Sequence, residues 1–132
     1  MSGAKGDDTL TGGKGNDTFV FDMYAPFDQA VIGKDTITDF GNGIDKIHLD
    51  KTTFNLLSSQ AGTGFSELSD FAVYEYISSA NVAEETILYV SSTNTLYYNG
   101  DGSEFGLGDG GGVIATFNNS PTLSANDFII AN

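Results

Sequence analysis

The sequence predicts an all-β fold, because a glycine-rich repeat at its start is followed by short apolar segments separated by turn residues. Glycine fills 17 of the 132 positions, and proline only two. Hydrophobic residues make up 39% of the chain, and a chain of this length can bury enough surface to fold alone. We therefore expect a single all-β unit whose first third is built from repeats.

A nine-residue repeat opens the chain. Residues 3–11 read G-A-K-G-D-D-T-L-T and residues 12–20 read G-G-K-G-N-D-T-F-V, which agree at five positions and share an apolar eighth residue. A third copy at residues 30–38 returns in phase two repeat lengths after the second, and a looser copy covers residues 43–47. Between residues 21 and 29 the pattern fails. Repeats of this form are typical of parallel β-helices whose turns bind calcium, whereas isolated hairpin turns are the simpler alternative.

Charge and composition exclude several classes of function. The chain has no cysteine and one histidine, which excludes disulfide scaffolds, cysteine-ligated zinc and histidine pairs. A net charge of −13 argues against nucleic acid or an anionic membrane surface as a partner. No apolar run reaches the roughly 18 residues of a membrane span. The many aspartates instead suit hard cations that prefer oxygen ligands.

The repeats resemble the repeats-in-toxin family, the hemolysin-type calcium-binding proteins. The segment D-T-I-T-D-F-G-N-G-I-D-K-I-H-L is similar to the C-terminal region of serralysin-type proteases and to alginate epimerase repeat modules. This resemblance implies a short right-handed parallel calcium β-roll that continues into an antiparallel β-sandwich-like C-terminal cap. It assigns residues 1–49 to the calcium-binding nonapeptide repeats and residues 50–132 to the β-rich cap.

In that family two repeat units complete one coil, so each turn stacks on the turn two repeats further along and holds Ca²⁺ with it. The resemblance therefore pairs turn 12–17 with turn 30–35. It implies that Asp17 and Asp35 supply carboxylate ligands. The implied carbonyl ligands are those of Gly12, Lys14, Val31 and Gly33.

Asp8 closes the first repeat turn, residues 3–8, and is also expected to be a calcium ligand. The turn that should stack on it departs from the repeat pattern. Asp22 or Asp28 could substitute there, or Asp8 could pair with a turn upstream of this sequence. The looser fourth copy leaves Asp45 without a clear partner.

The remainder of the chain predicts short strands, two helical turns and a hairpin. Helical turns are expected within residues 50–60 and 66–70, and S-S-T-N-T at residues 91–95 predicts a hairpin turn. The expected strands are residues 18–22, where apolar and polar residues alternate in part, and residues 36–40, 45–49, 71–77, 86–91, 95–99, 112–117 and 127–130.

The resemblance implies a calcium-binding, non-catalytic C-terminal module that folds on calcium binding and carries a type I secretion signal for an upstream passenger. The signal is expected at the C-terminus, where Asp127 is followed by Phe128, Ile129 and Ile130; a last edge strand is the alternative. The N-terminus lacks the apolar stretch of a signal peptide. We therefore expect secretion to the extracellular space through the type I machinery, without an N-terminal signal peptide.

Two other classes of function stay open. A calcium-dependent carbohydrate-binding accessory module for an alginate-like polysaccharide could use Lys5 and Lys14 in the turns. It could also use a strip of tyrosines, Tyr74, Tyr76, Tyr89, Tyr97 and Tyr98. A stand-alone enzyme is disfavoured, because H-E-x-x-H, G-x-S-x-G and P-loop motifs are absent; no catalytic residue is expected. Asn99, Asp101 and Ser103 have the spacing of the first EF-hand ligands, without the closing glutamate.

Overall fold

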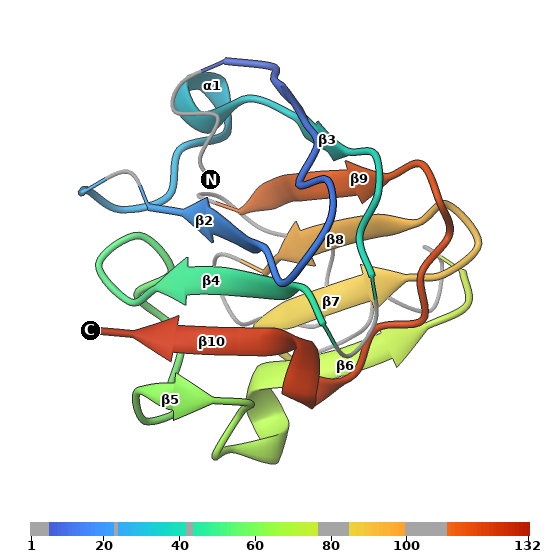
Figure 1. The fold of residues 1–132 in the computed structure, drawn as a ribbon. Helices are drawn as coiled ribbons and strands as arrows, with labels where there is room; N and C mark the ends of the chain where they lie inside the picture. Colours follow the sequence, from blue (N-terminus) through green and yellow to red (C-terminus); the bar gives the residue numbers. More distant parts are fainter. Residues whose placement is uncertain (1–5, 23, 42–43, 77–84, 100–110) are drawn as a thin grey trace.

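The computed structural model describes residues 6–22, 24–41, 44–76, 85–99 and 111–132 (Figure 1). It confirms the predicted all-β fold. The strands are β1 (Thr9–Leu10), β2 (Thr18–Phe21), β3 (Asp35–Ile37), β4 (Lys46–Asp50), β5 (Gly62–Thr63), β6 (Phe71–Tyr74), β7 (Ile87–Val90), β8 (Thr95–Tyr98), β9 (Gly112–Phe117) and β10 (Phe128–Ala131). One helical turn, α1 (Gln29–Ile32), and two 3₁₀ turns, η1 (Leu68–Asp70) and η2 (Ala125–Asp127), complete the described elements. None of the described helices is long and apolar enough to cross a membrane.

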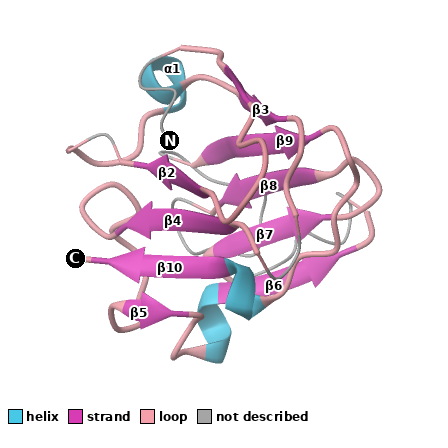
Figure 2. Cartoon of the chain, in the orientation of Figure 1, coloured by secondary structure: helices cyan, strands magenta, loops and turns pink. Residues whose placement is uncertain are grey.

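The strands form two layers that face each other (Figure 2). The six-strand sheet has the order β1-β3-β9-β8-β7-β6, and the four-strand sheet has the order β2-β4-β10-β5. Alternating burial along β2, where Phe19 and Phe21 are buried and their neighbours are half-buried, turns one side of each strand into the space between the layers. The core therefore lies between the two sheets, as in other layered β folds.

The first four strands make two turns of a coil that visits the two sheets alternately. Strands β1 and β3 pair in parallel with Thr9 opposite Thr36, and β2 and β4 pair in parallel with Thr18 opposite Lys46. One coil thus takes about three repeat lengths instead of two, and the predicted stacking of every second turn is wrong. The connection between β2 and β3, residues 22–34, explains the longer coil. It contains α1 and is longer than the turn of a single repeat.

The C-terminal strands form a third rung on this coil. Strand β9 pairs in parallel with β3, with Thr116 opposite Thr36, and β10 pairs in parallel with β4, with Phe128 opposite Ile47. The antiparallel pairs β7–β8, β8–β9 and β5–β10 and the parallel pair β6–β7 complete the sheets. Both sheets therefore run through the repeats and the cap, and β10 is an interior strand between β4 and β5.

Aromatic side chains fill the space between the sheets. Phe65, Phe71 and Phe128 lie within 5.1 Å of one another, measured between ring centroids. The ring centroids of Phe40 and Phe117 lie 5.5 Å apart, so the second turn of the coil packs against the third rung. Such pairs add specific geometry to the burial of apolar surface, so they hold the coil and the cap as one core.

The expected strands agree with the structure to within two residues at each end, with two exceptions: β3 ends at Ile37 rather than at residue 40, and β6 ends at Tyr74 rather than at residue 77, which lies outside the described part. The helical turn expected at 66–70 is η1, but residues 50–60 contain turns rather than a helix. The sequence patterns did not predict β1, β5, α1 or η2. These are two- to four-residue elements whose pairing partners, not their own sequences, determine their conformation.

Candidate metal centre

The first candidate site is the N-terminal turn pair, residues 6–8 stacked on residues 31–35. The Gly6 N–H donates to the Val31 carbonyl at 3.0 Å, and the Asp8 N–H donates to Asp35 Oδ1 at 3.0 Å. In the reverse direction the Lys34 N–H donates to a carboxylate oxygen of Asp7 at 2.7 Å. These bonds place the carboxylate of Asp35 directly beside the backbone of Asp8.

The second turn pair repeats this arrangement between residues 11–17 and residues 38–45, of which 42 and 43 lie outside the described part. The Asp17 N–H donates to Asp45 Oδ1 at 3.0 Å. The Gly12 and Gly13 N–H groups donate to the two carboxylate oxygens of Asp39 at 2.9 and 2.8 Å. Both turn pairs therefore join an aspartate of one turn to the backbone of the equivalent aspartate in the turn before it.

The upstream aspartate of each turn pair keeps an unsatisfied oxygen. Within the described residues, Asp8 Oδ2 and Asp17 Oδ2 are buried and have no hydrogen-bond partner. A buried carboxylate oxygen without a partner is costly, and a bound cation is one of the few groups that can offset this cost. One such oxygen lies at the equivalent position of each turn pair, so each turn pair fits a site for a hard divalent cation.

Glycines make the close packing of these turns feasible. A Cβ atom on Gly33, which has φ +77°, would collide with the backbone of Gly6. A Cβ atom on Gly12 would lie 2.6 Å from Asp17 Oδ2, so the bare backbone of Gly12 makes room for that carboxylate. At both positions the absence of a side chain lets neighbouring atoms approach closely. At Gly33 glycine also suits the positive φ.

Burial makes ionised Asp35 unfavourable in the metal-free fold. The pKa of Asp35 is raised to about 6, chiefly because burial removes solvent and also because of the neighbouring charges of Asp8 and Asp7, while the hydrogen bond from the Asp8 N–H opposes this rise. The protonated form is therefore favoured in the folded state more than in the unfolded chain. Ionisation of Asp35 at neutral pH therefore destabilises the metal-free fold.

This pKa shift predicts an unusual pH dependence in the absence of metal. Because the pKa of Asp35 is higher in the folded state than its ordinary value of 3.8, its stabilising contribution is fully present below that value. The contribution is lost as the pH rises through about 6. In EDTA we expect a higher melting temperature at pH 5 than at pH 7, and a smaller difference for Asp35→Asn. An unchanged difference in that variant would contradict the assignment to Asp35.

The structure regroups the residues proposed from the sequence. Asp17 faces Asp45 rather than Asp35, and Asp35 instead faces Asp8. The predicted pairing of turn 12–17 with turn 30–35 is therefore wrong, because these turns lie at opposite edges of the coil. Asp22 does not join a turn pair, since its carboxylate accepts the Tyr24 N–H.

The four residues proposed as carbonyl ligands all lie in the turn pairs. Gly12 lies beneath the Asp17 carboxylate, and Lys14 is exposed at the tip of the same turn. Val31 and Gly33 lie in the N-terminal turn pair, where the Val31 carbonyl accepts the Gly6 N–H with one of its two lone pairs. Their role as ligands stays a prediction.

Sequence analysis missed Asp7 and Asp39 and left Asp45 without a partner. The spacing of Asp-x-apolar segments could have found the partner of Asp45, since Asp8 to Asp35 and Asp17 to Asp45 are nearly equal steps; this spacing gives no signal for Asp7 or Asp39. No group of three or more His, Cys, Asp and Glu side chains suited to a metal occurs in the described residues. Each turn pair thus offers carboxylates in pairs, and further oxygen ligands would have to come from the backbone.

Of two other predicted features, one is not formed and the other lies largely outside the described residues. Tyr89 and Tyr98 are buried in the core, so the tyrosines do not make an exposed strip for a polysaccharide. Asn99 is buried, and its side-chain amide donates to the Glu85 carbonyl at 3.2 Å. Asp101 and Ser103, the other members of the EF-hand-like spacing, lie outside the described residues, as does Lys5.

The two-sheet all-β fold with stacked acidic turns is the kind of fold expected of a repeats-in-toxin C-terminal module. The family model for the Peptidase M10 serralysin C terminal matches residues 1–100, and the chain belongs to this family. The family is the calcium-binding, non-catalytic C-terminal module of serralysin, which is a secreted type of protein. A search of curated proteins found no significant match.

Proposed function

We propose that the chain binds Ca²⁺ in its two turn pairs and that this binding completes its folding. The observation that carries the proposal is the pair of buried, unpartnered oxygens, Asp8 Oδ2 and Asp17 Oδ2. Asp35 and Asp45 supply the second carboxylate of each turn pair. Backbone carbonyls of Gly12, Lys14, Val31 and Gly33 supply further oxygens, because calcium requires six to eight of them.

Calcium acts on this fold by linkage. Without metal the acidic turns repel each other in a chain of net charge −13, and burial together with this repulsion raises the pKa of Asp35. A cation that binds only the folded form stabilises it by about 2.7 kcal/mol at a hundredfold excess over Kd. The module is therefore weakly stable or unfolded at low calcium and folded at the millimolar calcium found outside cells.

A calcium titration followed by amide NMR tests the two turn pairs separately. We expect Asp17→Asn to remove calcium-induced shifts from residues 12–17 and 39–45 and to leave those of residues 6–8 and 31–35. Asp8→Asn should give the reverse pattern. Each change removes one charge from an oxygen ligand, so calcium affinity at that turn pair should fall about tenfold or more.

Glu67→Gln is the matched control, because Glu67 is an exposed carboxylate outside both turn pairs. It should leave every calcium-induced shift unchanged. Two results would contradict the proposal. One is a spectrum that does not respond to millimolar calcium. The other is an Asp17→Asn variant that loses the shifts of residues 31–35 instead of those of residues 39–45.

We further infer that the chain's C-terminus carries the type I secretion signal for an upstream passenger, with residues 1–49 as the roll and residues 50–132 as the cap. The membership of a secreted family and the sequence Asp127-Phe128-Ile129-Ile130 support this. Phe128 and Ile130 are buried in the interior strand β10. The machinery would therefore read this segment before the chain folds, and export of a fused passenger with and without residues 127–132 tests this step.

A further inference from the structure

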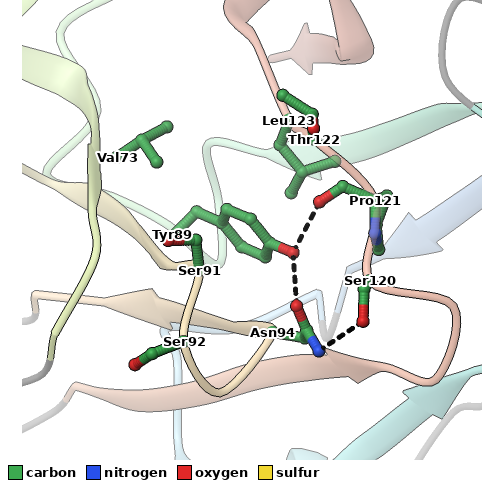
Figure 3. Close-up of a pocket in the computed structure, with 9 residues that line it drawn as sticks. All are labelled: Val73, Tyr89, Ser91, Ser92, Asn94, Ser120, Pro121, Thr122 and Leu123. Atoms are coloured by element: carbon green, nitrogen blue, oxygen red, sulfur yellow. Dashed lines mark hydrogen bonds between the residues drawn. The ribbon is translucent and has the colours of Figure 1, made fainter.

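A pocket that is separate from the turn pairs lies at one end of the six-strand sheet (Figure 3). Its volume is about 300 Å³. It lies between the end of β6, the turn that joins β7 to β8, and the segment that follows β9. The residues that line it are Val73, Tyr89, Ser91, Ser92, Asn94, Ser120, Pro121, Thr122 and Leu123. None of them belongs to the repeat turns, and none carries a charge.

Unusual backbone conformations gather at this pocket. Among the described residues, three non-glycine residues have positive φ, and two of them, Asn94 at 52° and Ser120 at 50°, line the pocket. Ser120 also precedes Pro121, and a residue before proline favours extended backbone. The Asn94 side-chain amide donates to Ser120 Oγ at 2.9 Å, which locks the two loops together. Conformations of this kind persist where the surrounding structure holds them, and they concentrate at ligand sites.

The hydroxyl groups at the pocket keep hydrogen-bonding capacity for a ligand. The Tyr89 hydroxyl donates to the Pro121 carbonyl at 2.8 Å, so the lone pairs of its oxygen can still accept (Figure 3). Ser120 Oγ accepts from Asn94, so its own hydrogen remains available for donation. The pocket thus offers an uncharged acceptor and an uncharged donor beside the apolar side chains of Val73 and Leu123.

We propose that this pocket binds one ring of a neutral sugar. A sugar ring has hydroxyls that pair with donors and acceptors and C–H groups that contact apolar side chains. The pocket volume is at the lower end of small-molecule sites, which suits a single ring. The absence of charge at the lining, in a chain of net charge −13, disfavours sugar acids such as uronates. This proposal is independent of calcium binding in the turn pairs.

Ligand titrations on the calcium-saturated protein, followed by amide NMR, test the proposal. The probes are D-glucose, D-galactose and D-mannose, with D-glucuronate and cyclohexanol as comparisons for charge and for loss of hydroxyls. We expect at least one hexose to shift residues 89–94 and 120–123 with a Kd of about 1–10 mM, as befits a small weak ligand. Glucuronate and cyclohexanol should bind at least about tenfold more weakly.

Two substitutions of Ser120 separate binding from folding. Ser120→Gly removes the hydroxyl together with the hydrogen bond from Asn94, but it relieves the strain of the positive φ; because these effects on stability oppose each other, the melting temperature should change little. Ser120→Ala removes the hydroxyl and keeps the strain. Both should weaken hexose binding about three- to tenfold, the effect of one neutral hydrogen bond. Ser58→Gly, at an exposed serine outside the pocket, is the control and should bind as the unmodified chain does.

Three results would overturn the proposal. The first is the absence of any hexose-induced shift at about 100 mM, a hundredfold above the tight end of the expected range. The second is equal binding of hexose and cyclohexanol, or shifts confined to residues 60–66 and 125–126, which line another concavity. The third is unchanged hexose binding by both Ser120 variants.

Discussion

Phe128→Ala is expected to lower the free energy of unfolding by about 3–5 kcal/mol, the range for a fully buried phenylalanine. The Phe128 side chain has no exposed surface, and its ring packs against both Phe65 and Phe71 at centroid distances of 5.0 Å. It also lies opposite Ile47 in the parallel pair of β10 and β4. Thermal or denaturant unfolding in excess calcium measures this loss.

The same substitution should raise the calcium concentration needed for folding, although Phe128 lies in neither turn pair. Calcium binds the folded form, so any loss of folding free energy must be offset by more calcium. Ile129→Ala is the control, because Ile129 is in the same strand, points to the other face and is half-buried. We expect a cost of about 1 kcal/mol for it. Equal effects of the two variants would contradict the interior position of Phe128.

Gly33→Ala is expected to break the N-terminal turn pair. The new Cβ would collide with the carbonyl group of Gly6 and would lie 2.7 Å from a carboxylate oxygen of Asp7. The position also has φ +77°, which a residue with a side chain rarely adopts. Relief of the clash requires the two turns to separate, and we expect a loss of about 3 kcal/mol or more in excess calcium.

Gly15→Ala is the matched control for backbone conformation. Gly15 has φ +92°, yet no atom lies within 4 Å of the position that its Cβ would take. It should therefore cost about 1 kcal/mol, from backbone conformation alone. In NMR titrations Gly33→Ala should abolish calcium-induced shifts at residues 6–8 and 31–35 and keep those at 12–17. If both variants behave alike, contact between the stacked turns is not what Gly33 provides.

Much of the fold could be predicted from local patterns. The segments G-V-I-A-T-F and T-L-Y-Y carry enough β-branched and aromatic residues to be identified as strands, and they are β9 and β8. The repeat located the acidic turns and the aspartates that close them. Elements of two to four residues, such as β1 and α1, could not be predicted, because the conformation of so short a segment depends on the segments it packs against.

The partners of those aspartates could not be predicted in the same way. The repeat suggested that each turn stacks on the second turn after it, whereas Asp8 meets Asp35 and Asp17 meets Asp45. The difference arises in residues 22–34, whose path length depends on how α1 and the adjoining loop pack. Phe27, for example, is buried in the core and donates its N–H to the Thr53 carbonyl. No local sequence pattern predicts this contact.

The amino-acid sequence by itself determined the acidic, cysteine-free character of the chain, the turn conformations that its glycines allow and the aspartates that precede its strands. These are properties of single residues and near neighbours, so they can be inferred without a structure. Only the tertiary structure decided which turns stack, and that β9 and β10 form the third rung of the coil. Those pairings join segments that are distant in the sequence, such as Thr36 with Thr116, and they depend on the packing of one shared core between two sheets.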